Sequence, residues 1–260
     1  MSRGKLYLIP GLVWHLTQRC HNKDFLLRFS KDRQRWLHWL FCAKKRHRLS
    51  ILNYAVTSNH VHLLVYNDGR KNIIPRSMLL IASRTAQEYN FRKNRSGAFW
   101  EDNYHATAVE SGKHLRECLV YIDLNMVRAG VVNHPEDWPF SGYNEIQSNR
   151  KRYRLIDMEK LLSLVQIKKQ KDFKEIYNDW INSKLDSKDM KRKSSWTESI
   201  AVGSENFISK VRTDLKGKAK NRKIIESRGQ FILKESLNSY NIVFSMEMSG
   251  LSKDKKTYSL

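Results

Sequence analysis

The sequence predicts an α+β protein: a ferredoxin-like antiparallel sheet with the element order β-α-β-β-α-β-α, followed by a mostly α-helical C-terminal extension. Two observations predict this class. Four segments alternate apolar and polar residues as strands do, and three segments carry apolar residues at helical spacing. Two of the strands are separated only by Ser58-Asn59, which predicts a hairpin. The 260 residues suffice for such a domain with an appended unit.

Each element follows from its own pattern. In the first strand, Leu12, Trp14 and Leu16 alternate with Val13, His15 and Thr17. Gly130 is a plausible end for the third helix. A sheet of this kind is expected to carry its helices on one face. We expect strands at 11–20, 50–57, 60–66 and 103–109, and helices at 31–47, 76–92 and 112–128.

The composition of the sequence changes after residue 147. We therefore expect a catalytic domain at 1–147 and a basic, mostly helical extension at 148–260. The extension begins with a basic linker, and residues 157–182 have the composition of a helix. A second polar linker covers 183–195. Residues 196–215 predict two helices with a turn at Gly203 and Ser204 as N-cap, and the last ten residues look frayed.

Charge is the strongest compositional signal, because 48 Lys and Arg face 26 Asp and Glu, a net charge of +22. Half of the excess lies in residues 151–260, so both parts of the chain are suited to a polyanion such as DNA. The three cysteines form no CxxC pair, which disfavours disulfides and thiolate zinc sites. The sequence contains neither a long apolar span nor an export signal. We therefore expect a cytoplasmic protein without membrane contact.

Two motifs could bring chemistry together. His60 and His62 flank Val61 on a predicted strand, so both imidazoles face the same side and could bind one cation. Tyr121 and Asn125 are four residues apart on a predicted helix, so the phenol and the amide project together. An amide oxygen can serve as a third ligand to a hard cation. Taken alone, the histidine pair is at least as typical of a solvated strand face, and the Tyr121–Asn125 pair is more typical of a packed ring beside a surface asparagine.

Together, these motifs resemble the single-tyrosine HUH transposases, and most closely the REP-associated tyrosine transposases. The resemblance covers roughly residues 5–145 and departs from the family at Asn125-Met126-Val127, where relatives often have proline after the asparagine. Beyond residue 195, ESIAVGSENF is a weaker match to the extensions of longer relatives. The matching segments are LTQRCHNKDF (16–25), SNHVHLLV (58–65), FWEDNYHATAV (99–109), YIDLNMVRAGVV (121–132) and HPEDWPFS (134–141).

The resemblance implies a transposase and endonuclease that cleaves and rejoins single-stranded DNA, in hairpins of the REP type, through a 5′-phosphotyrosine. Tyr121 would be the nucleophile, and His60, His62 and Asn125 would hold Mg²⁺ or Mn²⁺. A free phenol titrates near pH 10, so the cation would have to supply most of the activation. Two imidazoles suit Zn²⁺ or Mn²⁺ better than Mg²⁺. Glu101, Asp102 and His105 are second-rank candidates for a further ligand or a proton relay.

Substrate binding must involve other residues. The candidates are basic side chains that could neutralise phosphates and aromatic rings that could stack on unpaired bases, although Trp100 could equally belong to the core. The basic runs at 191–193 and 216–223 could grip a duplex stem or form a solvated linker. The candidate substrate-binding residues are Arg19, Arg84, Arg92, Lys93, Arg95, Trp100 and Tyr104.

Two other classes of function remain open. A ferredoxin-like sheet is also RRM-like, so the chain could be a non-catalytic module that binds single-stranded nucleic acid, although it lacks a clear RNP1 motif. A metallohydrolase could use the two histidines with water as nucleophile, and Tyr121 would then be dispensable. We expect a monomer, with a homodimer as the alternative.

Overall fold

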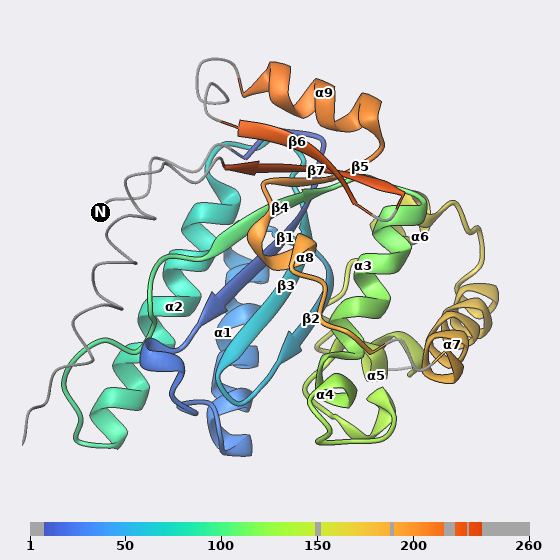
Figure 1. The fold of residues 1–260 in the computed structure, drawn as a ribbon. Helices are drawn as coiled ribbons and strands as arrows, with labels where there is room; N and C mark the ends of the chain where they lie inside the picture. Colours follow the sequence, from blue (N-terminus) through green and yellow to red (C-terminus); the bar gives the residue numbers. More distant parts are fainter. Residues whose placement is uncertain (1–7, 149–151, 188–189, 216–221, 228, 236–260) are drawn as a thin grey trace, which may run out of the picture.

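The computed structural model describes residues 8–148, 152–187, 190–215, 222–227 and 229–235. It confirms the α+β class with a seven-stranded, mostly antiparallel sheet in the order β2-β3-β1-β4-β5-β7-β6 (Figure 1). The first four strands all lie within a few residues of their predicted positions. They are β1 Val13–Arg19, β2 Ser50–Val56, β3 His60–Tyr66 and β4 His105–Val109.

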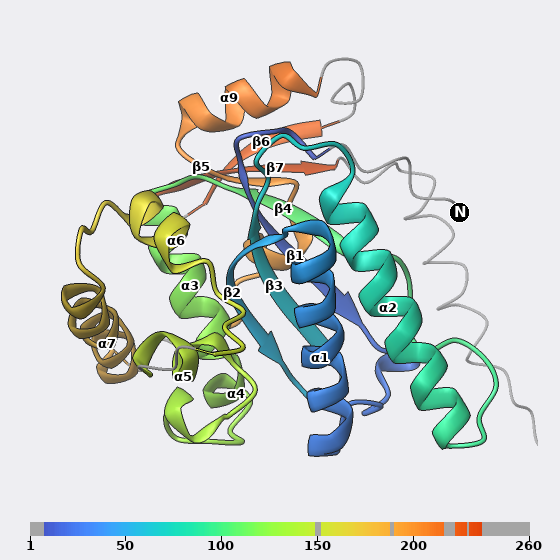
Figure 2. The same ribbon diagram turned by 180° about the vertical axis from the view of Figure 1, so that it is seen from behind.

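The helices lie on both faces of this sheet, so the prediction of a single helical face is wrong. Helices α1 (Ser30–His47) and α2 (Ile73–Arg92) pack side by side over one face (Figure 2). Helix α3 (Lys113–Asp123) covers the opposite face, where Asn53 of β2 donates a hydrogen bond to its Leu119 carbonyl. The reason lies in the strands, because their second face carries buried polar groups that need partners.

The expected helix at 112–128 is split in two. Leu124 has ψ near zero and ends α3, and a short helix α4 (Asn125–Arg128) follows. Leu124 is almost fully buried, so packing favours this bend. Tyr121 and Asn125 therefore lie on two consecutive short helices, and the simple four-residue helical spacing only approximates their relation.

The C-terminal extension is less helical than predicted. Ala201–Gly203 forms strand β5, which pairs in parallel with β4, and β7 and β6 continue the same sheet. Gly203 permits this because a Cβ there would lie 2.4 Å from the Phe207 ring. The N-cap prediction for Ser204 is confirmed, since its side chain accepts from the Phe207 amide. The remaining strands are β6 Arg222–Ser227 and β7 Gln230–Glu235.

Three boundaries in the extension also differ from expectation. The predicted helix at 157–182 is two helices, because Gln166 adopts a left-handed conformation that ends the first. The second runs on into the expected linker at 183–195, and 196–215 contains a strand between two helices. The last ten residues, and 216–221 of the basic run, lie outside the described residues. The remaining helical elements are η1 His21–Lys23, η2 Pro135–Asp137, α5 Gly142–Gln147, α6 Met158–Val165, α7 Gln170–Asp186, α8 Ser195–Glu198 and α9 Glu205–Asp214.

The core lies on both sides of the sheet and is rich in aromatic residues. Trp14 and Trp36 are buried in the main domain, and Phe173, Tyr177 and Trp196 are fully buried in the extension. Among the described residues, no helix has the length and apolar character needed to cross a bilayer.

Candidate active site

A polar cavity of about 820 Å³ lies over the β1–β3 face of the sheet, beneath α4 and the segment 190–198. It contains all four residues that the motifs singled out. His60, His62, Tyr121 and Asn125 line it together. The two imidazole rings are 4.9 Å apart between centroids, and the Tyr121 ring centroid is 6.0 Å from that of His62.

A chain of hydrogen bonds fixes the tautomer of His62. His15 Nδ1 lies 2.9 Å from the Trp196 carbonyl, which can only accept, so this nitrogen carries the proton. His15 Nε2 is then an acceptor, and at 2.9 Å it receives the Nδ1 proton of His62. Burial keeps both rings neutral, since it lowers the pKa of His15 to about 3 and that of His62 well below its usual value. The Nε2 of His62 therefore carries a lone pair, which can accept a hydrogen bond or bind a cation.

His60 presents the same nitrogen for a similar reason. Its Nδ1 lies 2.7 Å from Asn59 Oδ1, an acceptor, so Nδ1 carries the proton and Nε2 keeps its lone pair. Its pKa is lowered to about 4, mainly by burial and secondarily by Arg19. The turn before β3 thus orients one ligand, and β1 orients the other.

Asn125 completes a donor set that fits a divalent cation. Its side-chain amide lies 2.9 Å from His62 Nε2, so both groups point at one place. Turning the amide over, which exchanges its nearly equivalent N and O atoms, would aim Oδ1 there. Two imidazole nitrogens and one amide oxygen suit an exchangeable divalent ion. In the part of the chain that the structure describes, no three His, Cys, Asp or Glu side chains form a metal cluster.

The phenol of Tyr121 is buried and surrounded by cations. Only 7% of the residue is exposed, and burial raises its pKa, while Arg128 and Arg192 oppose that rise. The Arg128 guanidinium lies 4.1 Å from the ring centroid and donates to the Tyr121 carbonyl at 2.6 Å. Arg192 comes from the extension and lines the same cavity. Negative charge that develops on the phenol oxygen would therefore meet two guanidinium groups.

The structure brings only one of the seven candidate substrate-binding residues into this cavity. Arg19 lines it, as do the second-rank candidates Glu101, Asp102 and His105. His105 is engaged by the extension, since its Nε2 lies 2.9 Å from the Ser199 carbonyl. Tyr104 is largely buried, which raises its pKa to about 12.

The other five candidates lie around α2 and the turn after it. The indole NH of Trp100 donates to the Ala82 carbonyl at 3.0 Å, and Arg92 pairs with Asp32 of α1. Arg84 lies 5.6 Å above the Trp39 ring, Lys93 lies 5.2 Å from the Phe29 ring, and Arg95 donates to Asn90 and to the Ala98 carbonyl.

Sequence reasoning missed His15, Arg128, Arg192 and Trp196. For His15 the sequence offers a partial signal, because it alternates with the apolar residues of the first predicted strand and therefore lies on the opposite face from Trp14 and Leu16. Arg128 had only its position three residues after Asn125. Nothing local marks Trp196, whose backbone carbonyl reaches His15 across 181 residues.

Parts of this chain are similar to known transposases. Residues 9–125 match the family described as "Transposase IS200 like". A solved REP-associated tyrosine transposase bound to a REP hairpin is similar at 22% identity with a TM-score of 0.47, over 56% of this chain and 84% of that one. A putative transposase from Deinococcus radiodurans R1 is similar at 17% identity with a TM-score of 0.33, over 46% of this chain and 92% of that one. No curated protein sequence matches the chain.

The family match ends at Asn125, so it includes both histidines of β3, Tyr121 and the asparagine itself. It confirms the resemblance that the motifs indicated. Residues 9–125, slightly less than half of this chain, are therefore similar to the IS200-like transposase family.

Proposed function

We propose that this transposase cleaves and rejoins single-stranded DNA through a covalent bond between Tyr121 and a 5′-phosphate. The observation that carries the proposal is the meeting of Tyr121, His60, His62 and Asn125 in one cavity. The residues come from a strand and from two helices some sixty positions later, and nothing in the packing of a stable core requires two neutral histidines, an amide and a phenol to meet.

The covalent step is a transesterification. The Tyr121 oxygen attacks phosphorus in line, a phosphotyrosine bond forms, the bond from phosphorus to the 3′-oxygen breaks, and the phenolic proton is released. The departing 3′-oxygen takes up a proton as a hydroxyl. Bond energy is conserved, so a second 3′-hydroxyl can reverse the step and join new ends. Arg128 and Arg192 favour the reaction because they oppose the cost of charging a buried phenol.

His60, His62 and Asn125 would hold the divalent cation, Mg²⁺ or Mn²⁺, that polarises the phosphate oxygen. What the protein contributes is orientation. Asn59 fixes the tautomer of His60, and His15 fixes that of His62, so both Nε2 lone pairs are available without reorganisation. The substrate proposed is unpaired DNA beside a hairpin, because a net charge of +22 suits a chain of phosphates.

The test uses full-length protein, Mn²⁺ and a pool of 3′-end-labelled hairpins with randomised single-stranded flanks. We expect a labelled band at the mass of the protein on a denaturing gel, because the 5′-phosphate end stays on the enzyme. Tyr121→Phe should abolish the band. Tyr66→Phe, on the same sheet but at the far end of β3, is the matched control and should keep it.

Three results would contradict the proposal in different ways. Equal adduct from Tyr121→Phe would remove the tyrosine from the mechanism. Free 5′-phosphate ends without any adduct would indicate a hydrolase that uses water. Tight, metal-independent binding without any cut strand would indicate an RRM-like binding module.

A further inference from the structure

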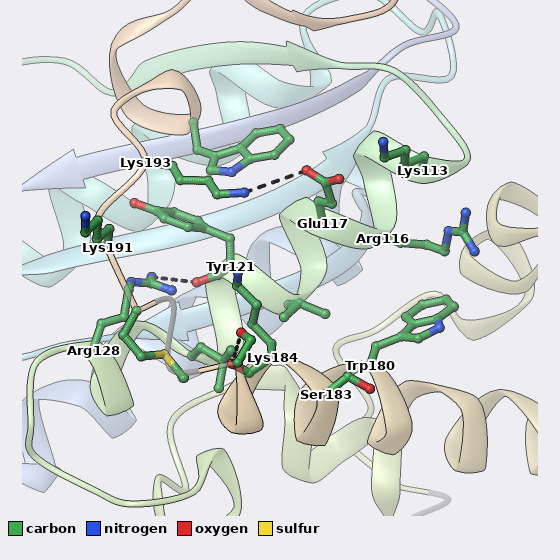
Figure 3. Close-up of a pocket in the computed structure, with 15 residues that line it drawn as sticks. Lys113, Arg116, Glu117, Tyr121, Arg128, Trp180, Ser183, Lys184, Lys191 and Lys193 are labelled. Carbon is green, nitrogen blue, oxygen red and sulfur yellow. Dashed lines mark hydrogen bonds and ion pairs between the residues drawn. The ribbon is translucent and has the colours of Figure 1, made fainter. Parts of the chain in front are cut away.

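A second cavity, of about 490 Å³, lies on the other side of Tyr121 between α3, α7 and the segment 190–196 (Figure 3). Its volume is in the range of small-molecule sites. The extension supplies more than half of its lining, so the cavity reaches beyond the segment that matches the transposase family. Its apolar wall is formed by Val120, Leu124, Trp180, Met190 and Trp196.

The rim of this cavity is strongly basic. Of the described residues that line it, six are cationic and only Glu117 is acidic, with its carboxylate 3.9 Å from Lys193 Nζ. The Arg116 guanidinium lies 5.4 Å from the Trp180 ring. This arrangement suits a ligand with a flat apolar part and a negative charge. The six are Lys113, Arg116, Arg128, Lys184, Lys191 and Lys193.

Tyr121 is common to the two cavities, as is Arg128. Figure 3 shows Tyr121 among the lining residues, which also include Lys191 and Lys193. A ligand in the second cavity would therefore lie next to the nucleophile. If Tyr121 attacks a phosphate in the histidine cavity, as proposed above, the strand that carries this phosphate would lie beside the second cavity.

We propose that the second cavity is a DNA subsite that takes an unpaired nucleotide adjacent to the scissile phosphate, with its base against Trp180 and Met190 and its phosphate among the lysines. This inference rests on the proposed function and adds to it a binding site for the single strand next to the cleavage point. A nucleotide meets both requirements of the cavity, since every base has a flat face and every link a negative charge.

The first experiment locates the strand directly. Full-length protein without metal is bound to a twenty-nucleotide oligo(dT) that carries 5-iodouracil, irradiated, and digested for mass spectrometry. We expect cross-links on the α7 peptide that contains Trp180. Binding with cross-links confined to other peptides would overturn the subsite and leave the proposed function intact. Absence of any DNA binding would instead overturn the proposed function.

The second experiment measures the affinity of the same oligo(dT) for variants. Trp180→Ala should weaken binding about tenfold, as loss of a stacked base does. Because Trp180 also packs on Phe173 and Tyr177, the double variant Lys184→Glu, Lys191→Glu provides an independent test that spares this packing. It should weaken binding by a similar factor. The matched control, Lys168→Glu with Lys169→Glu, reverses two exposed charges outside the cavity. Equal effects of the two double variants would overturn the proposal.

Discussion

The two cavities that meet at Tyr121 are built in opposite ways. The histidine cavity is polar, and its imidazoles are held by a fixed chain of hydrogen bonds. The second cavity has apolar walls and a rim of six long basic side chains. The first is suited to placing a reacting phosphate within a fraction of an ångström, and the second to holding a variable strand. The two cavities share Tyr121, Arg128 and Met190, so the proposed chemistry and the proposed strand binding would meet at the same side chains.

The strongest test of this comparison removes both histidines of β3. His60→Ala with His62→Ala should lower the rate of cleavage by about a thousandfold or more, because cation activation is lost. DNA affinity should stay within a few-fold, since the basic rim is unchanged. Cleavage and anisotropy assays measure the two effects, with His38→Ala plus His47→Ala on α1 as the matched control. Equal loss of both properties would mean that the histidines hold the fold.

Acid pH tests the histidine cavity next, because His60 and His62 line it and His15 is hydrogen-bonded to His62, and burial lowers the pKa of all three. Between about pH 4 and 6.5, His15, His60 and His62 are protonated in the unfolded chain but stay neutral in the folded protein. Asp123 opposes this by one proton, since burial raises its pKa to about 7. The unfolded chain therefore binds a net two protons more than the folded chain. For each pH unit of acidification near pH 5, the free energy of unfolding should fall by about 3 kcal/mol.

Urea denaturation at pH 7, 6 and 5 measures that slope. His15→Phe removes one of the protons and should roughly halve it. A protein that becomes more stable on acidification would contradict the assignment of neutral, buried imidazoles.

A subtler variant concerns the orientation of His62. His15→Asn cannot hold both His62 Nδ1 and the Trp196 carbonyl, so we expect Mn²⁺ affinity to fall about 10–100-fold, as for other partners of metal ligands. Calorimetric titration of Mn²⁺ without DNA measures this. Thr107→Val is the matched control, because Thr107 Oγ1 donates to the Ser199 carbonyl at 2.6 Å and lies 3.2 Å from the same Trp196 carbonyl. Equal losses would show that the backbone position, and not the imidazole, matters.

The smallest expected effect is a change in salt dependence. Arg19→Ala should reduce the slope of log affinity against log salt by about 0.7, the value for one phosphate contact on a single strand. Arg84→Ala, on α2 above Trp39, tests a candidate that the structure places outside the cavity. If the two variants act equally, the DNA path also crosses α2, and the contrast between the two cavities becomes weaker.

The predictable part of this molecule is the part with short-range periodicity. The faces of His60 and His62 follow from the two-residue repeat of a strand, and Tyr121 and Asn125 follow approximately from the turn of a helix. Strand β5 was missed because Ala201–Gly203 is too short to show alternation. The link from His15 to Trp196 depends on how the extension lies against β1 and β4, which is a long-range packing result that no local pattern encodes.

One contact sets a constraint on how this chain can vary. The group that holds His15 is the peptide carbonyl of residue 196, and every amino acid has one. Exchanging the tryptophan would alter packing but leave that acceptor in place. Inserting or deleting a single residue between α8 and β5 would shift the carbonyl out of reach. His15 would then lose the acceptor that fixes the tautomers of His15 and His62. The spacing of this stretch, more than its composition, therefore governs the proton arrangement at the histidines.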